Sequence, residues 1–229
     1  MKKTCLWYLP GAFFLLCALL NLAGCIWFPV LKETVKPALL PLLALTTLAF
    51  LAPRFDQADG RKAFLLMAAQ LFGFAGDTLL IPSGFPFFAG GMAAFLAGHV
   101  FYLCLFGGIS WKGIKAGQWV LAGVVMGFLV AGLVDLIGIS GVMLAPMSIY
   151  GLGLMLLIFS GLMGVVRIGG ATWWIILAGG LLFTFSDAQI AMQTFGVLPF
   201  ALRGFVIMLT YLAAQVLLAI GGVRLVLGK

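Results

Sequence analysis

The sequence predicts an all-α, polytopic membrane protein, built as a single bundle of about eight transmembrane helices. Of its 229 residues, 64% are hydrophobic and only 8% are charged, whereas soluble domains carry about 25% charged residues. The mean hydropathy is +1.24. This composition excludes a soluble enzyme, a disordered tail and a nucleic-acid-binding domain. Because no repeat, linker or low-complexity segment divides the chain, residues 1–229 are expected to form one transmembrane domain.

Apolar windows place the expected helices one after another along the chain. They run over 6–29, 37–53, 62–80, 88–107, 118–139, 142–166, 171–195 and 200–227. Each window is long enough to cross a hydrocarbon core of about 30 Å. Prolines stand at several expected boundaries, where their missing N–H is tolerated, namely at Pro37, Pro53, Pro82, Pro86 and Pro199. The separation over 136–145 is the least marked, because few polar residues divide the fifth helix from the sixth.

The first helix has some features of an exported precursor. Lys2 and Lys3 precede the apolar run, and Leu22-Ala-Gly-Cys25 has the shape of a bacterial lipobox. However, the apolar run continues to Phe28, and many further spans follow it. An uncleaved first helix is therefore the favoured interpretation.

Positive charges are distributed unevenly between alternate connections. In an eight-span topology, ten of the 13 Lys and Arg residues fall on the side of both termini: Lys2, Lys3, Arg54, Arg61, Lys62, Lys112, Lys115, Arg167, Arg224 and Lys229. The other three, Lys32, Lys36 and Arg203, fall on the opposite side. Because cytoplasmic loops carry an excess of Lys and Arg, this asymmetry predicts cytoplasmic termini, most simply in a bacterial inner membrane.

Ionisable side chains inside spanning helices mark candidate functional sites, because they are costly to bury. The candidates are Asp77, His99, Asp135 and Asp187. Asp77 lies about 22 Å up the third helix and Asp187 about 24 Å up the seventh, at 1.5 Å per residue. The two carboxyls are therefore expected to share a level near the outer edge of the core. Asp135 reaches a similar level, but near its helix end it can simply face interfacial water.

Other polar residues fit the lining of a site at that level. Arg203, Tyr211 and Gln215 share one stripe of the eighth helix, and His99 and Tyr102 are three residues apart on the fourth. The remaining candidates are Tyr150, Ser186 and Lys36. We expect Lys36 and Arg203 to hold an anionic group such as a phosphate.

Each candidate also has a purely structural interpretation. Asp77 can be a carboxylate paired with Lys36, Asp187 a hydrogen-bond hub, and His99 a partner between helices. The tyrosines can be packing residues. Small residues such as those in Gly123-x-x-x-Gly127 are expected to let membrane helices pack closely.

The sequence lacks the motifs of several common enzyme classes: G-x-S-x-G, H-E-x-x-H, Walker A and the Rossmann fingerprint. Its cysteines, Cys5, Cys17, Cys25 and Cys104, form no metal-ligand pattern, and we expect them to be small buried apolar residues rather than disulfides or metal ligands. Two carboxyls in a low dielectric can share one proton, so that one is neutral while the other is ionised. This arrangement suits general acid–base catalysis, including protonation of a lipid vinyl ether to an oxocarbenium ion, but it suits proton-coupled transport equally.

Several segments carry a more specific pattern. They are Leu71–Leu80 (LFGFAGDTLL), Gly90–Tyr102 (GGMAAFLAGHVFY), Gly179–Ala191 (GGLLFTFSDAQIA) and Tyr211–Gly221 (YLAAQVLLAIG), with Lys36-Pro37 before the first of them. In this order, over roughly residues 35–222, the chain resembles the YhhN-type lysoplasmalogenases, a family of integral membrane alkenyl ether hydrolases. Residues 108–141 show no such signature, so the resemblance does not support Asp135 as a site residue.

The resemblance implies an eight-helix enzyme that hydrolyses the vinyl ether of lysoplasmalogens. The products are a fatty aldehyde and glycerophosphoethanolamine or glycerophosphocholine. It implies that Asp77 and Asp187 are the catalytic pair, that no cofactor or metal is needed, and that the partners are a lysophospholipid and the bilayer. The family's His and Tyr fall on His99 and Tyr102, and its Tyr and Gln fall on Tyr211 and Gln215.

Two other functions remain open on the residues alone. A small proton-coupled transporter would use Asp77, Asp187 and His99 as a relay, and would be marked by an inverted repeat with broken helices. A non-catalytic lipid-binding or scaffold protein would show neither turnover nor transport.

Overall fold

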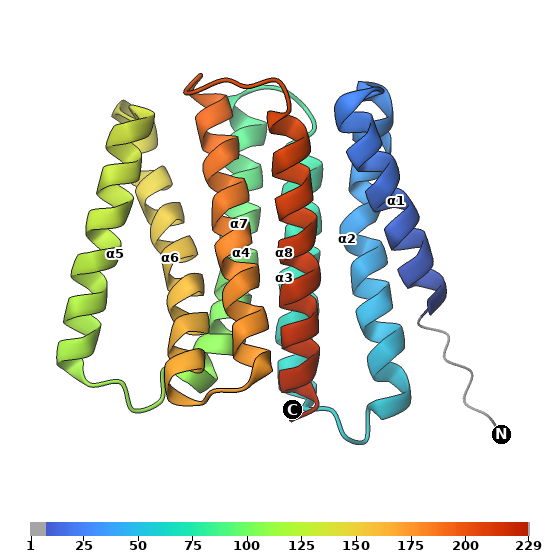
Figure 1. The fold of residues 1–229 in the computed structure, drawn as a ribbon, viewed down its shortest axis with the longest axis vertical. Helices are drawn as coiled ribbons and strands as arrows, with labels where there is room; N and C mark the ends of the chain where they lie inside the picture. The colour runs from blue at the N-terminus through green and yellow to red at the C-terminus, as the bar shows by residue number, and fades with distance from the viewer. Residues whose placement is uncertain (1–7, 229) are drawn as a thin grey trace.

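A computed structural model describes residues 8–228, which form a bundle of eight long helices without a β-strand (Figure 1). The helices are α1 (Tyr8–Ile26), α2 (Pro29–Leu51), α3 (Gly60–Leu79), α4 (Phe85–Ser110), α5 (Ala116–Ile137), α6 (Leu144–Arg167), α7 (Ala171–Thr194) and α8 (Arg203–Val226). Two 3-10 turns, η1 (Ala52–Arg54) and η2 (Gly141–Met143), complete the regular structure. The predicted fold class and the number of helices are confirmed.

Seven of the helices are long and apolar enough to cross a membrane, which makes this an integral membrane protein. Of the eight helices described, α3 is the exception, and it is also the helix that carries the buried polar residues Gln70 and Asp77. It is sheltered because it packs against α2, α4 and α8.

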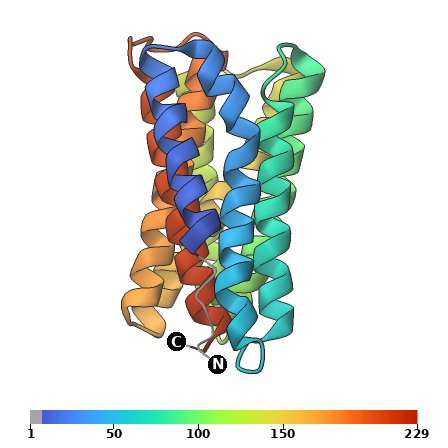
Figure 2. The ribbon, with the colours of Figure 1, turned by 90° about the vertical axis from the view of Figure 1, so that its right-hand side faces the viewer.

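The helices run up and down along one common axis. The connections α2–α3, α4–α5 and α6–α7 lie at the end of the bundle where α1 begins and α8 ends (Figures 1 and 2). These connections and the end of α8 carry most of the positive charge, as in the predicted topology. At the same end, the backbone N–H of Asp59 donates to the carbonyl of Val226 at 3.0 Å, which ties the start of α3 to the end of α8.

The start of the second helix was predicted wrongly. α2 begins at Pro29, so Pro37 and Pro41 lie inside it rather than at its boundary. Membrane helices tolerate internal prolines because neighbouring groups can satisfy the freed carbonyls. Consequently Lys36 lies two turns inside a helix rather than in a loop.

The connection between α1 and α2 is short because Gly24 permits close contact. A Cβ at Gly24 would lie 2.5 Å from the backbone nitrogen of Lys32. Asn21 donates from its side chain to the carbonyl of Lys32 at 2.9 Å. α1 thereby packs against α2 and also against α8 (Figure 2).

Glycine also sets the contact between α6 and α7, where Gly161 lies against backbone. A Cβ at Gly161 would approach the Cα of Leu177 to 2.7 Å. By contrast, nothing lies within 4 Å of a Cβ built at Gly123 or Gly127. The expectation that these two glycines pack against another helix is therefore wrong within the described chain: α5 lies at one edge of the bundle and packs chiefly on α6 (Figure 1).

The cysteines form no disulfide within residues 8–228. Cys17 and Cys25 are partly buried, whereas Cys104 is exposed on the outer surface of α4, so its predicted burial is wrong. Cys5 lies outside the described residues.

Candidate active site

Asp77 lies near the end of α3, with its carboxyl enclosed by two other helices. Its side chain is buried, and the residue is 2% exposed. Tyr211 of α8 donates a hydrogen bond to Oδ2 at 2.7 Å, and Nζ of Lys36 from α2 lies 3.6 Å from Oδ1. The carboxyl therefore has a neutral donor on one oxygen and a cation on the other.

A line of hydrogen bonds extends from this carboxyl toward the centre of the bundle. Nε2 of Gln215 donates to the Tyr211 hydroxyl at 3.3 Å, and the Tyr102 hydroxyl donates to Oε1 of Gln215 at 3.3 Å. Tyr211 and Gln215 are four residues apart, so one face of α8 presents both. Tyr102 of α4 completes a buried line of polar groups that holds the Tyr211 hydroxyl in position.

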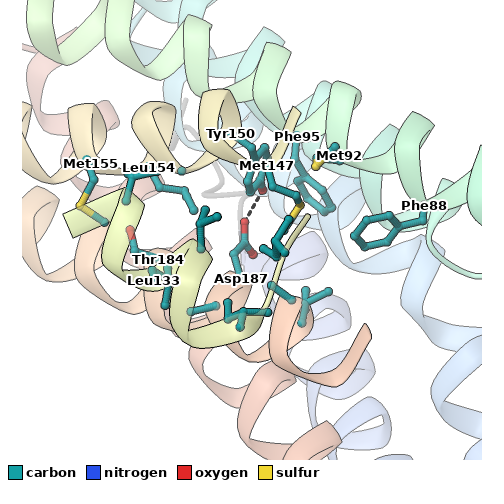
Figure 3. Close-up of a pocket in the computed structure, with 18 of the residues that line it drawn as sticks. Phe88, Met92, Phe95, Leu133, Met147, Tyr150, Leu154, Met155, Thr184 and Asp187 are labelled. Carbon is teal, nitrogen blue, oxygen red and sulfur yellow. Dashed lines mark hydrogen bonds between the residues drawn. The ribbon is translucent and has the colours of Figure 1, made fainter. Parts of the chain in front are cut away.

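Asp187 lies on α7, and it too accepts a hydrogen bond from a tyrosine. The donor is the hydroxyl of Tyr150 on α6 (Figure 3). Asp187 is 7% exposed, and neither of its oxygens forms an ion pair with the described residues. The site therefore contains two Asp–Tyr pairs, of which only one includes a lysine.

Aromatic rings fill the space between the two pairs. The Phe183 ring lies 5.6 Å from that of Tyr211 and 4.7 Å from that of His99, and His99 lies 5.5 Å from Tyr150, measured between centroids. Phe95 packs edge-on against both Phe183 and Tyr211. The rings of Phe183 and His99 therefore link the Tyr211 side of the cluster to the Tyr150 side.

His99 is the most isolated polar side chain of the cluster. It is 1% exposed, and neither ring nitrogen has a hydrogen-bond partner among the described residues. An imidazole in such surroundings is available to a ligand or a water molecule, because a buried polar group without a partner costs free energy.

A glycine explains how the aromatic group reaches the Asp77 side. A Cβ at Gly76, the residue before Asp77, would come within 2.7 Å of the Phe95 ring. Only a residue without a side chain allows α4 to bring this ring so close to α3.

Asp187 opens onto a cavity walled chiefly by α4, α5, α6 and α7 (Figure 3). The cavity has a volume of about 60 Å³ and is partly open to the outside. Its walls are mostly Leu, Ile, Val, Met and Phe side chains, and its polar lining comes from Asp187, Tyr150 and Thr184. This lining favours contact with an apolar group rather than with a charged one.

Three sequence candidates lie outside this cluster or point elsewhere. Ser186 donates from its hydroxyl to the carbonyl of Ile207 at 3.1 Å, so it joins α7 to α8. Arg203 directs Nη2 to the carbonyls of Val197, at 2.8 Å, and Leu198, in the loop before α8. Asp135 is exposed at the end of α5, in agreement with its interfacial interpretation.

The aromatic part of the site was not predicted from the sequence. Phe95 precedes His99 by four residues, and Phe183 precedes Asp187 by four, so each lies one helical turn from a polar candidate. This spacing of four residues could have identified both phenylalanines as neighbours of the site. No group of three His, Cys, Asp or Glu side chains able to hold a metal occurs within residues 8–228.

Comparison with known proteins gives a consistent result over nearly the whole chain. The model of the YhhN family matches residues 31–222. Human lysoplasmalogenase TMEM86B is 32% identical over 96% of this chain and 88% of its own length, and the mouse protein of the same name is 34% identical over 95% and 87%. Bovine lysoplasmalogenase TMEM86A is 28% identical over 88% and 86%. No solved structure matches.

Proposed function

The chain belongs to the YhhN family, and from this we propose that it is a lysoplasmalogenase. It hydrolyses the vinyl ether of a lysoplasmenyl phospholipid, and it releases a fatty aldehyde with glycerophosphoethanolamine or glycerophosphocholine. One observation carries the mechanism: two buried aspartates from separate helices share an aromatic-lined cluster beside an apolar cavity.

The partners of the two aspartates support different roles for them. Asp77, with an ammonium 3.6 Å away and a tyrosine donor, is suited to remain a carboxylate. Asp187, which has no ion-pair partner among the described residues and faces an apolar cavity, is suited to hold a proton. Asp187 is thus the general acid, and Asp77 is the base that stabilises the cation.

The reaction then proceeds in balanced steps. Asp187 gives its proton to the vinyl carbon that is remote from the ether oxygen, and the electron pair of the double bond forms the new C–H bond. The resulting oxocarbenium ion is stabilised by the carboxylates. Water adds to the carbon next to the oxygen and loses a proton to a carboxylate. The hemiacetal then loses its hydroxyl proton as its C–O bond to the glycerol oxygen breaks, and that oxygen takes up a proton, which gives the aldehyde and the glycerol hydroxyl. The proton taken earlier from water restores Asp187 to its neutral form.

The surrounding side chains orient these groups. Tyr150 and Tyr211 fix the two carboxyls, Gln215 and Tyr102 fix Tyr211, and Lys36 keeps Asp77 ionised. His99, with both nitrogens free of protein partners in residues 8–228, is the group best placed to bind the attacking water. Ser186 and Arg203 contribute by holding α7, α8 and the loop between them.

The position of the cluster suits a substrate that stays in the bilayer. Asp77 and Asp187 lie toward the end of the bundle opposite the end of α8 (Figure 1). With cytoplasmic termini, as the charge asymmetry indicates, this is the outer half of the membrane, in bacteria that of the inner membrane. A single-chain lipid has its ether bond just below the head group, at a level that matches the two carboxyls.

Purified full-length protein in detergent micelles, supplied with lysoplasmenyl-ethanolamine in D₂O buffer, tests the proposal. The expected products are glycerophosphoethanolamine and an aldehyde with one deuterium on the carbon next to the carbonyl, detected by mass spectrometry after rapid reduction. Absence of aldehyde would contradict the function. An aldehyde without deuterium would contradict protonation of the vinyl carbon.

A further inference from the structure

We propose that this site selects its substrate by the alkenyl chain and the vinyl ether but not by the phosphate, so that uncharged 1-alkenylglycerols are also substrates. The inference rests on the proposed function and deepens it, because it names a second substrate class for the same site. It also departs from the sequence-based expectation that Lys36 and Arg203 bind the phosphate.

The walls of the cavity offer nothing that attracts an anion. Within the described chain, no Lys or Arg lines it, and its one acidic residue is Asp187. Toward the outer end, the walls are formed by apolar residues such as Phe88, Ile137, Ile139 and Ala191. A phosphate drawn into this space would lose its hydration without gaining a charged partner, which is unfavourable.

Lys36 does not line the cavity. It lies on α2, a helix that contributes no residue to the cavity lining, and its Nζ pairs with Asp77 at 3.6 Å. The Lys36 side chain is only 14% exposed. To bind a phosphate, Lys36 would have to break its ion pair with the buried carboxylate of Asp77. Loss of one partner from a buried pair is strongly destabilising.

Arg203 is held in the loop before α8. Its Nη2 donates to two loop carbonyls, and its guanidinium carbon lies 5.0 Å from the centre of the Phe200 ring. Arg203 is 6% exposed and does not line the cavity. The guanidinium therefore stabilises the loop between α7 and α8.

The phosphate is left at the level where water and lipid head groups solvate it. The glycerol carbons separate it from the ether oxygen, and from Asp187 to the end of α7 the helix rises only about 10 Å. A head group at that position reaches the interface without entering the cavity. Its removal then changes little in the interactions that the site makes with the substrate.

Paired substrates test this directly. Aldehyde release is measured in mixed micelles at fixed mole fraction, with 1-alkenylglycerol and lysoplasmenyl-ethanolamine of the same chain. We expect kcat/KM values within about tenfold of each other, whereas a site built to bind phosphate would reject the phosphate-free lipid by a factor on the order of 10⁴. A preference of 100-fold or more for the phospholipid would overturn the inference.

Two variants test whether Lys36 or Arg203 contributes to binding of the phosphate. In Lys36→Gln and Arg203→Gln, turnover falls to whatever extent each residue supports the site, but we expect it to fall equally for both lipids. A loss confined to the phospholipid would show that the substituted residue binds phosphate, and the inference would be wrong. Failure of the wild-type protein to release aldehyde from either lipid would instead contradict the proposed function, which distinguishes the two failures.

Discussion

The ammonium of Lys36 lies 3.6 Å from Oδ1 of Asp77, and this ion pair makes the two carboxyls of the site unequal. Asp187 has a tyrosine donor but no ion-pair partner among the described residues. Catalysis by two identical carboxyls often depends on such a difference, because one must donate a proton while the other stays charged.

Replacement of either aspartate by asparagine should nearly abolish aldehyde release. Asp77→Asn and Asp187→Asn keep the shape of the side chain but remove the acid or the base, which general acid–base catalysis values at about 10²–10⁴-fold in rate. The measurement is kcat on lysoplasmenyl-ethanolamine. Asp135→Asn is the matched control, because the Asp135 carboxyl is exposed at the end of α5. This variant should keep the wild-type kcat. Near-normal turnover in both site variants would refute the carboxyl mechanism.

Loss of the Tyr150 hydroxyl should lower kcat. Tyr150→Phe leaves the ring in place but removes the hydrogen bond to Asp187. Asp187 becomes charged as it gives up its proton, and hydrogen bonds to charged groups contribute about 1.5–3 kcal/mol, so a loss of roughly 10- to 100-fold in kcat is expected. Tyr211→Phe makes the same change at Asp77. If both variants retain wild-type kcat, the tyrosines only pack.

A larger side chain in the cavity should obstruct the substrate. Ala188 of α7 lines the cavity, so Ala188→Phe is expected to raise KM for the lipid at least about tenfold, since ligand sites bury most of the ligand surface. Ala131→Phe, on the exposed side of α5, is the control. Equal KM values for the two variants would mean that the substrate does not occupy this space.

Alanine at Gly161 should destabilise the bundle without a change in chemistry. A Cβ there would lie 2.7 Å from the Cα of Leu177, and overpacking of this kind costs about 1–3 kcal/mol. The expected result is a lower Tm in detergent. Gly127→Ala, which meets nothing within 4 Å, should leave Tm unchanged or raise it slightly. A lower Tm for Gly127→Ala than for Gly161→Ala would contradict the described packing of α6 on α7.

Much of the fold followed from apolar windows and loop charges, because both respond directly to the bilayer. The eight helices and their alternation were predictable in this way. The start of α2 was not, because Pro37 looks like a boundary in sequence, whereas the contact of Gly24 with Lys32 that fixes the tight connection exists only in three dimensions.

The level of the site was also predictable, but its contacts were not. Helical rise places Asp77 and Asp187 at comparable heights, and residue spacing puts Tyr211 and Gln215 on one face of α8. The direction of a long side chain depends on its neighbours, so Arg203 could not be assigned to the loop carbonyls from its position alone. Likewise, the contact between the Phe95 and Phe183 rings, with centroids 6.3 Å apart, joins α4 to α7 only in three dimensions.

The chain contains a single histidine, and His99 stands between Tyr150 and Phe183. Isotopic labelling of histidine alone would therefore produce one imidazole signal, and this signal would arise from the reaction centre. Its chemical shifts would report tautomer, water access and the arrival of a lipid without an attached probe, so that occupancy of this enzyme could be followed spectroscopically during turnover.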